Sequence, residues 1–296
     1  MENGQWAMIK GITLVPLGGL CNRLRAVMSA MALAEACNVA LRVVWLRDKG
    51  LGARFSDLFQ PVEGIIESSS WMRYGVARRR NLWLPSLWQR CTYDCRITES
   101  DLATILDRDD SETSKAEAVL QCLRGNVLIQ TGLGFYPCDD RQFTQRFIPS
   151  EAVRQLLAPR LAMITPHTVG VHIRRTDNAQ AILHSPLSAF ERAMEEDLER
   201  DPETHFYVAT DDPSILTSLA NRFPTQVSEQ RTKKAEVRAK KSPTRSTVSG
   251  MQDAVADLFT LIACPRFHGS YWSSFSDTVV ACHDPEKANI IFQNIP

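Results

Sequence analysis

Short apolar runs alternate with longer amphipathic stretches along most of the chain. The runs have the length and β-branched content of buried strands, and they lie at residues 12–17, 39–46, 126–131, 168–173, 204–210 and 266–269. Apolar residues at helical spacing predict helices between several of these runs, near residues 22–37, 149–163, 186–200 and 251–264. Because strands that alternate with helices are typical of a parallel sheet, the pattern predicts an α/β fold.

A break in this pattern divides the chain. The 296 residues suffice for two domains of ordinary size, and Thr165-Pro166 ends the helix that precedes the strand at 168–173. We therefore predict one domain over residues 1–164 and a second over 165–296. Residues 50–123 give no clear pattern. The tryptophans that are interleaved with basic residues there favour either a small packed subdomain or a surface that binds an acceptor sugar.

The composition narrows the class of protein. Lys+Arg and Asp+Glu number 34 each, so no global charge points to nucleic acid or to a membrane surface. Eight cysteines are too few for a disulfide scaffold at this length. The N-terminus lacks the apolar core of a signal peptide, and no apolar run reaches the roughly 18 residues of a membrane span. We expect a cytoplasmic globular protein.

The segment 168–178, TVGVHIRRTDN, carries the most informative polar residues. Its apolar residues alternate as in a strand, and His172 and Arg174 share one face near the end of that strand. Ligands of open α/β sheets bind at the carboxyl ends of the strands. Arg174 and Arg175 would suit a diphosphate, because a guanidinium stays charged and offers parallel donors to phosphate oxygens. A salt-bridge network with Asp177 is the structural alternative.

A second candidate site follows the first predicted strand, where Gly18-Gly19 leads into a helix. Two glycines permit a tight turn and the close approach of a ligand to the backbone. We expect Asn22 to cap the helix, whose N-terminal N–H groups and dipole favour an anion. The glycines do not form a G-x-G-x-x-G fingerprint, so no nicotinamide site is predicted. A purely structural strand–turn–helix connection is the alternative.

The remaining candidate site residues are carboxylates and serines near the later strands. Asp211 and Asp212 follow the strand at 204–210, where they could bind a divalent metal or, more simply, cap the next helix. Asp257 interrupts the apolar face of the helix at 251–264. It could be an exposed acid or could accept the N1–H and amino groups of guanine. Three serines could donate to phosphate at a helix start or cap that helix, namely Ser270, Ser273 and Ser274.

Four stretches resemble, in order, the motifs of the α1,6-fucosyltransferase and protein O-fucosyltransferase superfamily. HIRRTD at 172–177 looks like its H-x-R-R-x-D motif, and GGLCNRLRA at 18–26 resembles the start of bacterial fucosyltransferase-like proteins. ATDDP at 209–213 and GSYWSSFSD at 269–277 are similar to two later motifs. The chain departs from the pattern at Cys21, where Gly is commoner, and at Asn178, where eukaryotic α1,6-enzymes carry Lys.

The resemblance implies a GT-B fold, in which an acceptor-side Rossmann-like domain (1–164) and a GDP-binding one (165–296) face each other across a cleft. It implies inverting transfer of a sugar, with L-fucose expected, from a GDP-sugar to a glycan hydroxyl without a metal or other cofactor. Arg174 would stabilise the departing GDP, and Asp177 is the candidate general base. The other positions implied to contact the nucleotide sugar are Gly19, Asn22, Arg23, His172, Arg175, Asp211, Asp257, Ser270, Ser273 and Ser274.

Two other functions stay open. A catalytically inactive sugar-nucleotide or glycan-binding protein could keep the same motifs. An α1,2-fucosyltransferase relative would share the Gly-Gly-x-x-Asn start and the H-x-R-R-x-D motif, but Arg23 stands where Gln is common in that group. The expected partners are GDP-fucose or a related GDP-sugar and an oligosaccharide acceptor. Nucleic acid is not expected.

Overall fold

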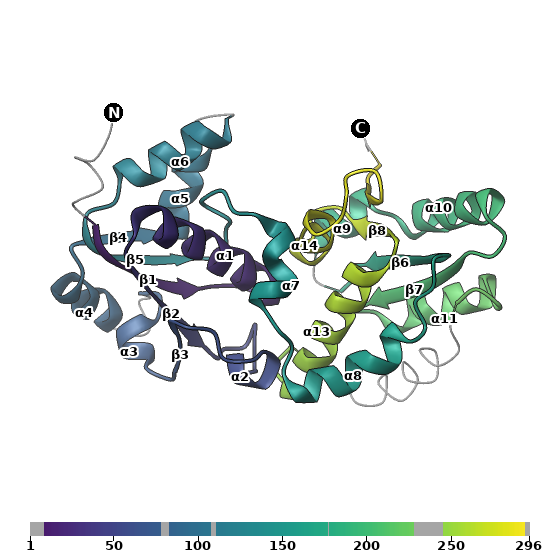
Figure 1. Cartoon of the computed structure of the whole chain (residues 1–296), viewed down its shortest axis with the longest axis horizontal. Coiled ribbons are helices and arrows are strands. Elements are labelled where there is room, and N and C mark those ends of the chain that lie inside the picture. Colours follow the sequence, from purple (N-terminus) through teal and green to yellow (C-terminus); the bar gives the residue numbers. More distant parts are fainter. Residues whose placement is uncertain (1–8, 78–82, 108–110, 177, 228–244, 294–296) are drawn as a thin grey trace. The chain divides into compact units, whose positions relative to one another are not determined.

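The computed structural model describes residues 9–77, 83–107, 111–176, 178–227 and 245–293 (Figure 1). The chain divides into two compact units, Met1–Ile148 and Pro149–Pro296. Each unit is an α/β domain with its own parallel sheet, which confirms the predicted fold class. The division falls earlier than the expected boundary at 164/165, because helix α8 (Glu151–Leu161) packs on helix α13 (Val248–Ala263) of the second unit.

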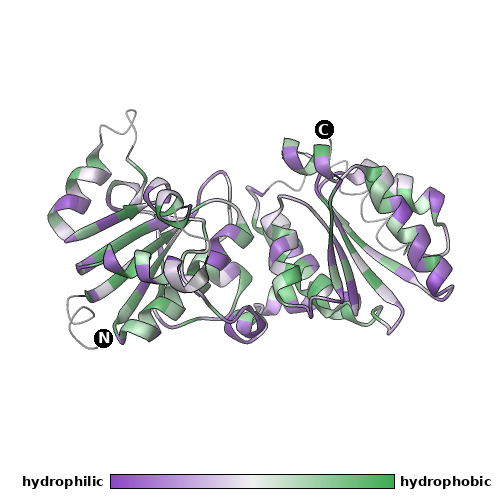
Figure 2. Cartoon of the chain, turned by 90° about the horizontal axis from the view of Figure 1, so that it is seen from above, coloured by the Kyte–Doolittle hydropathy of each residue, from purple (hydrophilic) through white to green (hydrophobic). Residues whose placement is uncertain are grey.

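The first unit is built on a five-stranded parallel sheet with the order β3-β2-β1-β5-β4. Its strands are largely apolar, and in Figure 2 they show green inside the unit while the helices turn polar residues outward. Helix α1 (Leu20–Cys37) packs against β1 and β2. The strands are β1 (Ile9–Pro16), β2 (Ala40–Leu46), β3 (Ile65–Ser68), β4 (Cys95–Thr98) and β5 (Gly125–Thr131).

The stretch without a clear sequence pattern supplies β3 and β4, the two edge strands, together with short helices. Trp88 packs against Tyr74 and Tyr93 at ring-centroid distances of 5.6 and 6.0 Å, so these aromatic side chains build structure. Trp71 and Trp83 remain exposed. The helices of the unit after α1 are α2 (Phe55–Leu58), α3 (Trp71–Tyr74), α4 (Leu84–Thr92), α5 (Glu99–Leu106), α6 (Glu112–Gln121) and α7 (Phe143–Arg146), with the 3-10 helix η3 (Asp140–Gln142).

A fully buried arginine ties the first turn of α1 to the end of β2. Arg23 has no exposed surface. Its Nε donates to the carbonyl of Gly18 at 2.9 Å, Nη1 donates to the carbonyl of Leu46, and Nη2 pairs with Asp48 Oδ2 at 2.7 Å. The guanidinium also lies over the Trp45 ring. Burial lowers the pKa of Arg23 while Asp48 acts to raise it, so the carboxylate is what makes a charged group acceptable here.

The second unit has a four-stranded parallel sheet with the order β7-β6-β8-β9. Every residue of the central strand β6 (Thr168–Ile173) is buried. Helix α10 (Leu187–Arg200) contributes Phe190 and Met194 to the core that covers β6 and β7. The other elements are β7 (His205–Thr210), β8 (Arg266–Ser270), β9 (Ala288–Ile291), α9 (Ala179–His184), α11 (Pro213–Arg222) and α14 (Ser274–Ala281).

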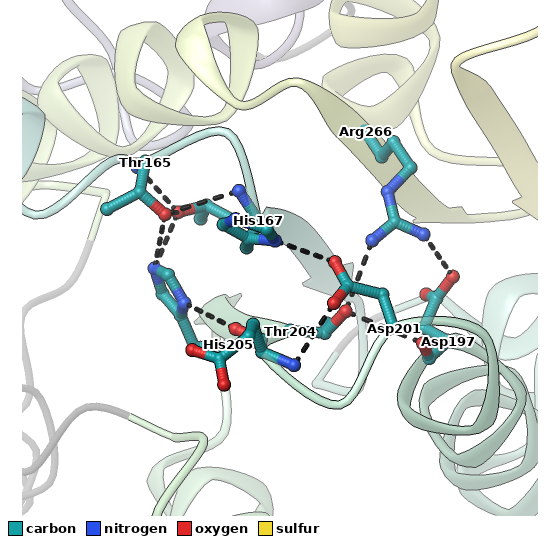
Figure 3. Close-up of polar contacts among 9 residues, drawn as sticks. Thr165, His167, Asp197, Asp201, Thr204, His205 and Arg266 are labelled. Atoms are coloured by element: carbon teal, nitrogen blue, oxygen red, sulfur yellow. Dashed lines mark hydrogen bonds and ion pairs between the residues drawn. The ribbon is translucent and has the colours of Figure 1, made fainter.

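A buried carboxylate anchors the amino ends of this sheet (Figure 3). Asp197 of α10 is 2% exposed, and its Oδ1 accepts from Arg266 at 2.7 Å and from Arg200 at 2.9 Å. Its Oδ2 lies 2.7 Å from His268 Nε2. Burial by itself would raise the pKa of Asp197, but the hydrogen bond and charge of His268, together with Arg266 and Arg200, hold that pKa below its ordinary value.

The neighbouring histidines in Figure 3 also have protein partners. His167 Nδ1 lies 2.8 Å from Asp201 Oδ2. His205 Nε2 lies 2.7 Å from the hydroxyl of Thr168 and 3.2 Å from that of Thr165. These groups connect the starts of β6 and β7, so their role at this edge is structural.

Replacing Arg23 with Met should lower the free energy of unfolding by about 3–5 kcal/mol, because it leaves the Asp48 carboxylate and the Leu46 carbonyl without their partner. Chemical denaturation measures the change. Arg146→Met is the matched control, since Arg146 pairs with Glu35 on the surface of the same unit, where such pairs contribute about 1 kcal/mol or less. Equal losses for the two variants would contradict the anchoring role of Arg23.

Replacing Asp197 with Asn should make the free energy of unfolding fall less steeply as the pH is lowered through the acid range. Because the pKa of Asp197 is lowered in the folded protein, its carboxylate stabilises the fold above the unfolded-state pKa of about 4. That contribution is lost as the pH falls through the lower, folded-state value. Urea denaturation across the acid range should show a shallower decline for the variant than for wild type. Asp284→Asn, at an exposed pair with Lys287, should leave the wild-type profile unchanged.

Candidate functional site

The carboxyl edge of the second sheet places Arg174 directly after the buried strand β6. The backbone N–H of Arg174 donates to Ser270 Oγ at 2.9 Å, and that hydroxyl lies 3.3 Å from the carbonyl of His172. Ser270 is the last residue of β8 and is fully buried. The serine therefore joins the ends of the two neighbouring strands and fixes where the arginine leaves the sheet.

One carboxylate organises the loop after β6. Asp211 Oδ2 pairs with Arg174 Nη1 at 2.9 Å, and Asp211 Oδ1 accepts from the backbone N–H of Arg175 at 2.8 Å. The Thr176 hydroxyl donates to Oδ2 at 2.7 Å, and the Thr176 backbone N–H does so at 3.3 Å. The side chains of Arg174 and Asp211 are 16% and 22% exposed, so a ligand can reach the pair. Asp211 thus holds the guanidinium of Arg174 at the edge where ligands of such sheets bind.

The two adjacent arginines have different roles. Arg175 Nη2 donates to the carbonyl of Ser185 at 2.7 Å, and its Nη1 donates to that of Ile182 at 3.3 Å. Burial lowers the pKa of Arg175, while Asp211 and Asp212 act to raise it. The Arg175 guanidinium thus binds carbonyls at the end of α9. These bonds anchor the arginine, and its expected contact with the nucleotide sugar stays a prediction.

His172 contacts the first turn of α14, and the expected residues Ser273 and Ser274 lie at the start of the same helix. The His172 ring is buried and stacks on Phe275 at 4.5 Å between centroids. Its Nδ1 lies 2.7 Å from Ser276 Oγ, which holds the first turn of α14 against β6. Ser273 is the N-cap of α14, but its side chain makes no capping hydrogen bond, and Ser274 is the first helical residue. The N–H groups at this helix start are suited to an anion.

The candidate base Asp177 lies outside the described residues. Its neighbour Asn178 is described and has two hydrogen bonds that were not predicted from the sequence. Asn178 Oδ1 accepts from the Ala181 N–H at 3.1 Å and caps α9, and its Nδ2 donates to the carbonyl of Trp272 at 2.6 Å. The loops after β6 and β8 are therefore joined at this second point.

In the first unit, the Gly18-Gly19 turn lies at the carboxyl edge of the sheet, as expected. Gly18 has φ +80°, where glycine is favoured, and a Cβ on Gly19 would meet no atom within 4 Å. The N-cap of α1 is Gly19, so the expectation that Asn22 caps the helix is wrong. Asn22 Oδ1 instead accepts from Arg25 at 2.9 Å. Gly19 and Asn22 remain accessible to a ligand of this unit, since both are partly exposed.

Arg23 and Asp257 were also expected to contact the nucleotide sugar, and both are buried and bound to other protein groups. Arg23 has no exposed surface, so it cannot touch a nucleotide sugar in this conformation. Asp257 is 8% exposed and its Oδ1 accepts from Arg160 Nη1 at 2.6 Å and from the Tyr207 hydroxyl at 2.7 Å. Tyr207 pairs with Gly170 in mid-strand, so Asp257 lies over the middle of the sheet. It does not lie at the carboxyl edge with Arg174.

The capping interpretation of Asp212 is confirmed. Its Oδ1 accepts from the backbone N–H of Ser214 at 2.9 Å and from the Ser214 hydroxyl at 2.7 Å, and Pro213 is the first residue of α11. Across the described part of the chain, no cluster of three or more His, Cys, Asp or Glu residues could hold a metal ion. Within the same residues, no helix combines the length and apolar character of a membrane span.

The chain matches no protein-family model and no curated protein sequence. Solved structures do resemble it. NodZ α-1,6-fucosyltransferase with GDP has a TM-score of 0.56 at 15% identity over 91% of both chains. POFUT1 with GDP has a TM-score of 0.53 at 12% identity over 95% of this chain and 98% of the other. A mutant of Arabidopsis thaliana FUT1 with GDP has a TM-score of 0.52 at 12% identity, over 93% of this chain and 68% of the other.

These neighbours cover both units of the chain, and a structure of NodZ soaked with GDP-fucose matches it with a TM-score of 0.55. At 12–15% identity the likeness concerns the fold. It agrees with the resemblance that the sequence motifs carry. The protein therefore has the GT-B fold of the fucosyltransferases NodZ and POFUT1.

Proposed function

We propose that the protein is a glycosyltransferase that moves a sugar, with L-fucose as the expected group, from a GDP-sugar to a hydroxyl of a glycan. The observation that carries the proposal is the position of Arg174. It emerges at the carboxyl end of a central, fully buried strand and is held there by Ser270 and Asp211. Its partly exposed guanidinium is thus available to a diphosphate in a fold whose solved neighbours bind GDP or GDP-fucose.

Arg174 would act on the leaving group. As the bond from the sugar to the diphosphate breaks, negative charge grows on the departing GDP, and a fixed guanidinium stabilises it. A guanidinium has five N–H donors in a rigid fork, so its pair with Asp211 is compatible with contacts to phosphate oxygens. Asp211 would keep the guanidinium in place before the donor binds, which reduces the entropy lost on binding.

The start of α14 would hold the diphosphate from a second side. Ser273 and Ser274 lie there, and the Ser273 side chain is not used as a helix cap. Ser270 and His172 support this arrangement through the hydrogen bonds to Arg174 and to Ser276. In this proposal Ser270, His172 and Arg175 position the groups that bind GDP, and Arg174 makes the contact.

The acceptor chemistry rests on the resemblance alone. Transfer with inversion is a direct displacement, in which a general base takes the proton of the acceptor hydroxyl as the hydroxyl oxygen attacks the anomeric carbon. Asp177 stays our candidate base. Gly19 and Asn22 stay candidates for contacts from the first unit. Metal independence is part of the proposal, with Arg174 and the α14 N-terminus supplying the positive charge that a metal ion would otherwise supply.

Replacing Arg174 with Ala should weaken GDP binding by roughly tenfold to a hundredfold, because a charge-assisted hydrogen bond is worth about 1.5–3 kcal/mol. Isothermal titration calorimetry measures the affinity. Arg222→Ala, at an exposed ion pair of the same unit, should bind GDP like wild type. Arg175→Ala should instead lower the thermal midpoint by releasing the carbonyls at the end of α9. An unchanged GDP affinity in Arg174→Ala would overturn the assignment of the donor site.

Removing divalent metal should leave GDP binding intact. We expect the same dissociation constant, within about twofold, in EDTA and in excess magnesium, because the proposed donor site neutralises the diphosphate with protein groups. The same titrations with UDP and ADP should show much weaker binding. A strict requirement for magnesium would reopen Asp211 as a metal ligand. Binding of GDP without release of GDP from GDP-fucose in the presence of glycans would favour the non-catalytic alternative.

A further inference from the structure

An exposed tryptophan lies two residues after the end of β8, and its carbonyl is bound by Asn178 of the loop that follows Arg174. Trp272 is 63% exposed, although large aromatic residues are usually among the more buried residues of a domain. Its carbonyl accepts the hydrogen bond from Asn178, close to the arginine motif in the sequence. The ring therefore stands on a backbone that is fixed to the proposed donor site, while the ring itself remains largely in contact with solvent.

The backbone at Trp272 is strained. Its φ is +54°, a left-handed conformation that Gly and Asn adopt readily and that is unusual for a bulky side chain. Such strain costs on the order of 1–3 kcal/mol and tends to occur at functional sites, where the surrounding structure enforces it. Glycine at this turn would relieve the strain. Trp83 of the first unit combines the same φ with a similarly exposed ring, so the feature that distinguishes Trp272 is its hydrogen bond to Asn178 beside the arginine loop.

Trp272 lies at the edge of a cluster of aromatic rings, in which Tyr271, Phe292 and His184 contact one another. The Tyr271 ring lies 5.7 Å from the Trp272 ring and 4.7 Å from the Phe292 ring, and Phe292 stacks on His184 at 5.4 Å, all between centroids. Phe292 is 50% exposed. Helix α9 ends at His184, and the carbonyl of its Ile182 is bound by Arg175. The cluster is thus connected to the arginine loop, and Trp272 and Phe292 are its most exposed rings.

We propose that Trp272 is a stacking platform for a sugar ring of the glycan acceptor, a role that rests on the proposed function. A pyranose ring has an apolar C–H face and hydroxyl groups around its edge, so it can lie flat on an indole while the hydroxyl groups remain hydrated. The Phe292 ring of the same cluster, which is 50% exposed, provides a further apolar face for a neighbouring sugar of an oligosaccharide. This arrangement would bring the acceptor next to the donor site without using any of the groups that bind the diphosphate.

Trp272→Gly is the most informative variant. Relief of the backbone strain should maintain or raise the stability, whereas loss of the proposed contact should lower the affinity for glycans. Glycine is favoured at φ +54°, so the thermal midpoint should stay equal to that of wild type or rise. Affinity for the best-binding member of a panel of neutral β-linked oligosaccharides should fall roughly tenfold or more, as for the loss of an aromatic stacking contact. Trp272→Phe should keep part of that affinity. Trp71→Ala, at an exposed tryptophan of the first unit, serves as the control and should bind like wild type.

GDP titrations of the same variants separate this inference from the proposed function. We expect Trp272→Gly to bind GDP like wild type. Glycan binding that is unchanged in Trp272→Gly, or absent from the wild type although GDP binds, would overturn the platform. Loss of GDP affinity in Trp272→Gly would place the ring in the nucleotide site and would overturn it too. A wild-type protein that binds no GDP but loses glycan binding with Trp272→Gly would refute the donor site and keep the platform.

Discussion

The site at the carboxyl edge of the second unit depends on the carboxylate of Asp211. Its two oxygens bind the guanidinium of Arg174, the backbone N–H groups of Arg175 and Thr176, and the Thr176 hydroxyl. The chain after β6 must turn sharply while it carries two positive charges, and this carboxylate both neutralises charge and replaces the lost backbone partners of the strand. Without it, the loop would have to find those partners in water, and Arg174 would lose its fixed position.

Arg–Asp pairs have two different roles in this protein, and the exposure of the arginine side chain distinguishes them. Arg23 with Asp48 and Arg160 with Asp257 pair inside the two units, where the arginines are 0% and 7% exposed and a ligand has no access to their guanidinium groups. Removal of one partner there leaves an uncompensated buried charge, so such pairs constrain the fold. The Arg174 side chain, which pairs with Asp211, is 16% exposed, so its charge is only partly desolvated. That intermediate position lets a guanidinium remain ordered in the absence of ligand and still meet a phosphate.

The sequence predicted three strands of each sheet and the edge that carries Arg174, because buried strands and the polar residues at their ends lie close together along the chain, but it missed the short strands β3, β4 and β9. It could not separate the roles of Arg174 and Arg175, because the carbonyls that bind Arg175 lie at the end of α9. The six-residue α9 was itself missed, because Ile182 is exposed and weakens the amphipathic pattern. The partner of Asp257 is Arg160 on α8, which the sequence had assigned to the other domain. Such long-range pairing has no signature in local patterns.

The hydrogen bond of Asn178 to Trp272 gives a physical reason for the departure of this chain from the motif pattern at Asn178. Asn178 accepts from the Ala181 N–H and donates to the Trp272 carbonyl, so it caps a helix and fixes a strained turn at the same time. A lysine has donors but no acceptor and could not do both. The exposed indole of Trp272 therefore depends on the Asn178 amide, which holds the backbone of this tryptophan in place. A chain with Lys at this position would need a different residue to start α9 and would lose one restraint on the turn after β8.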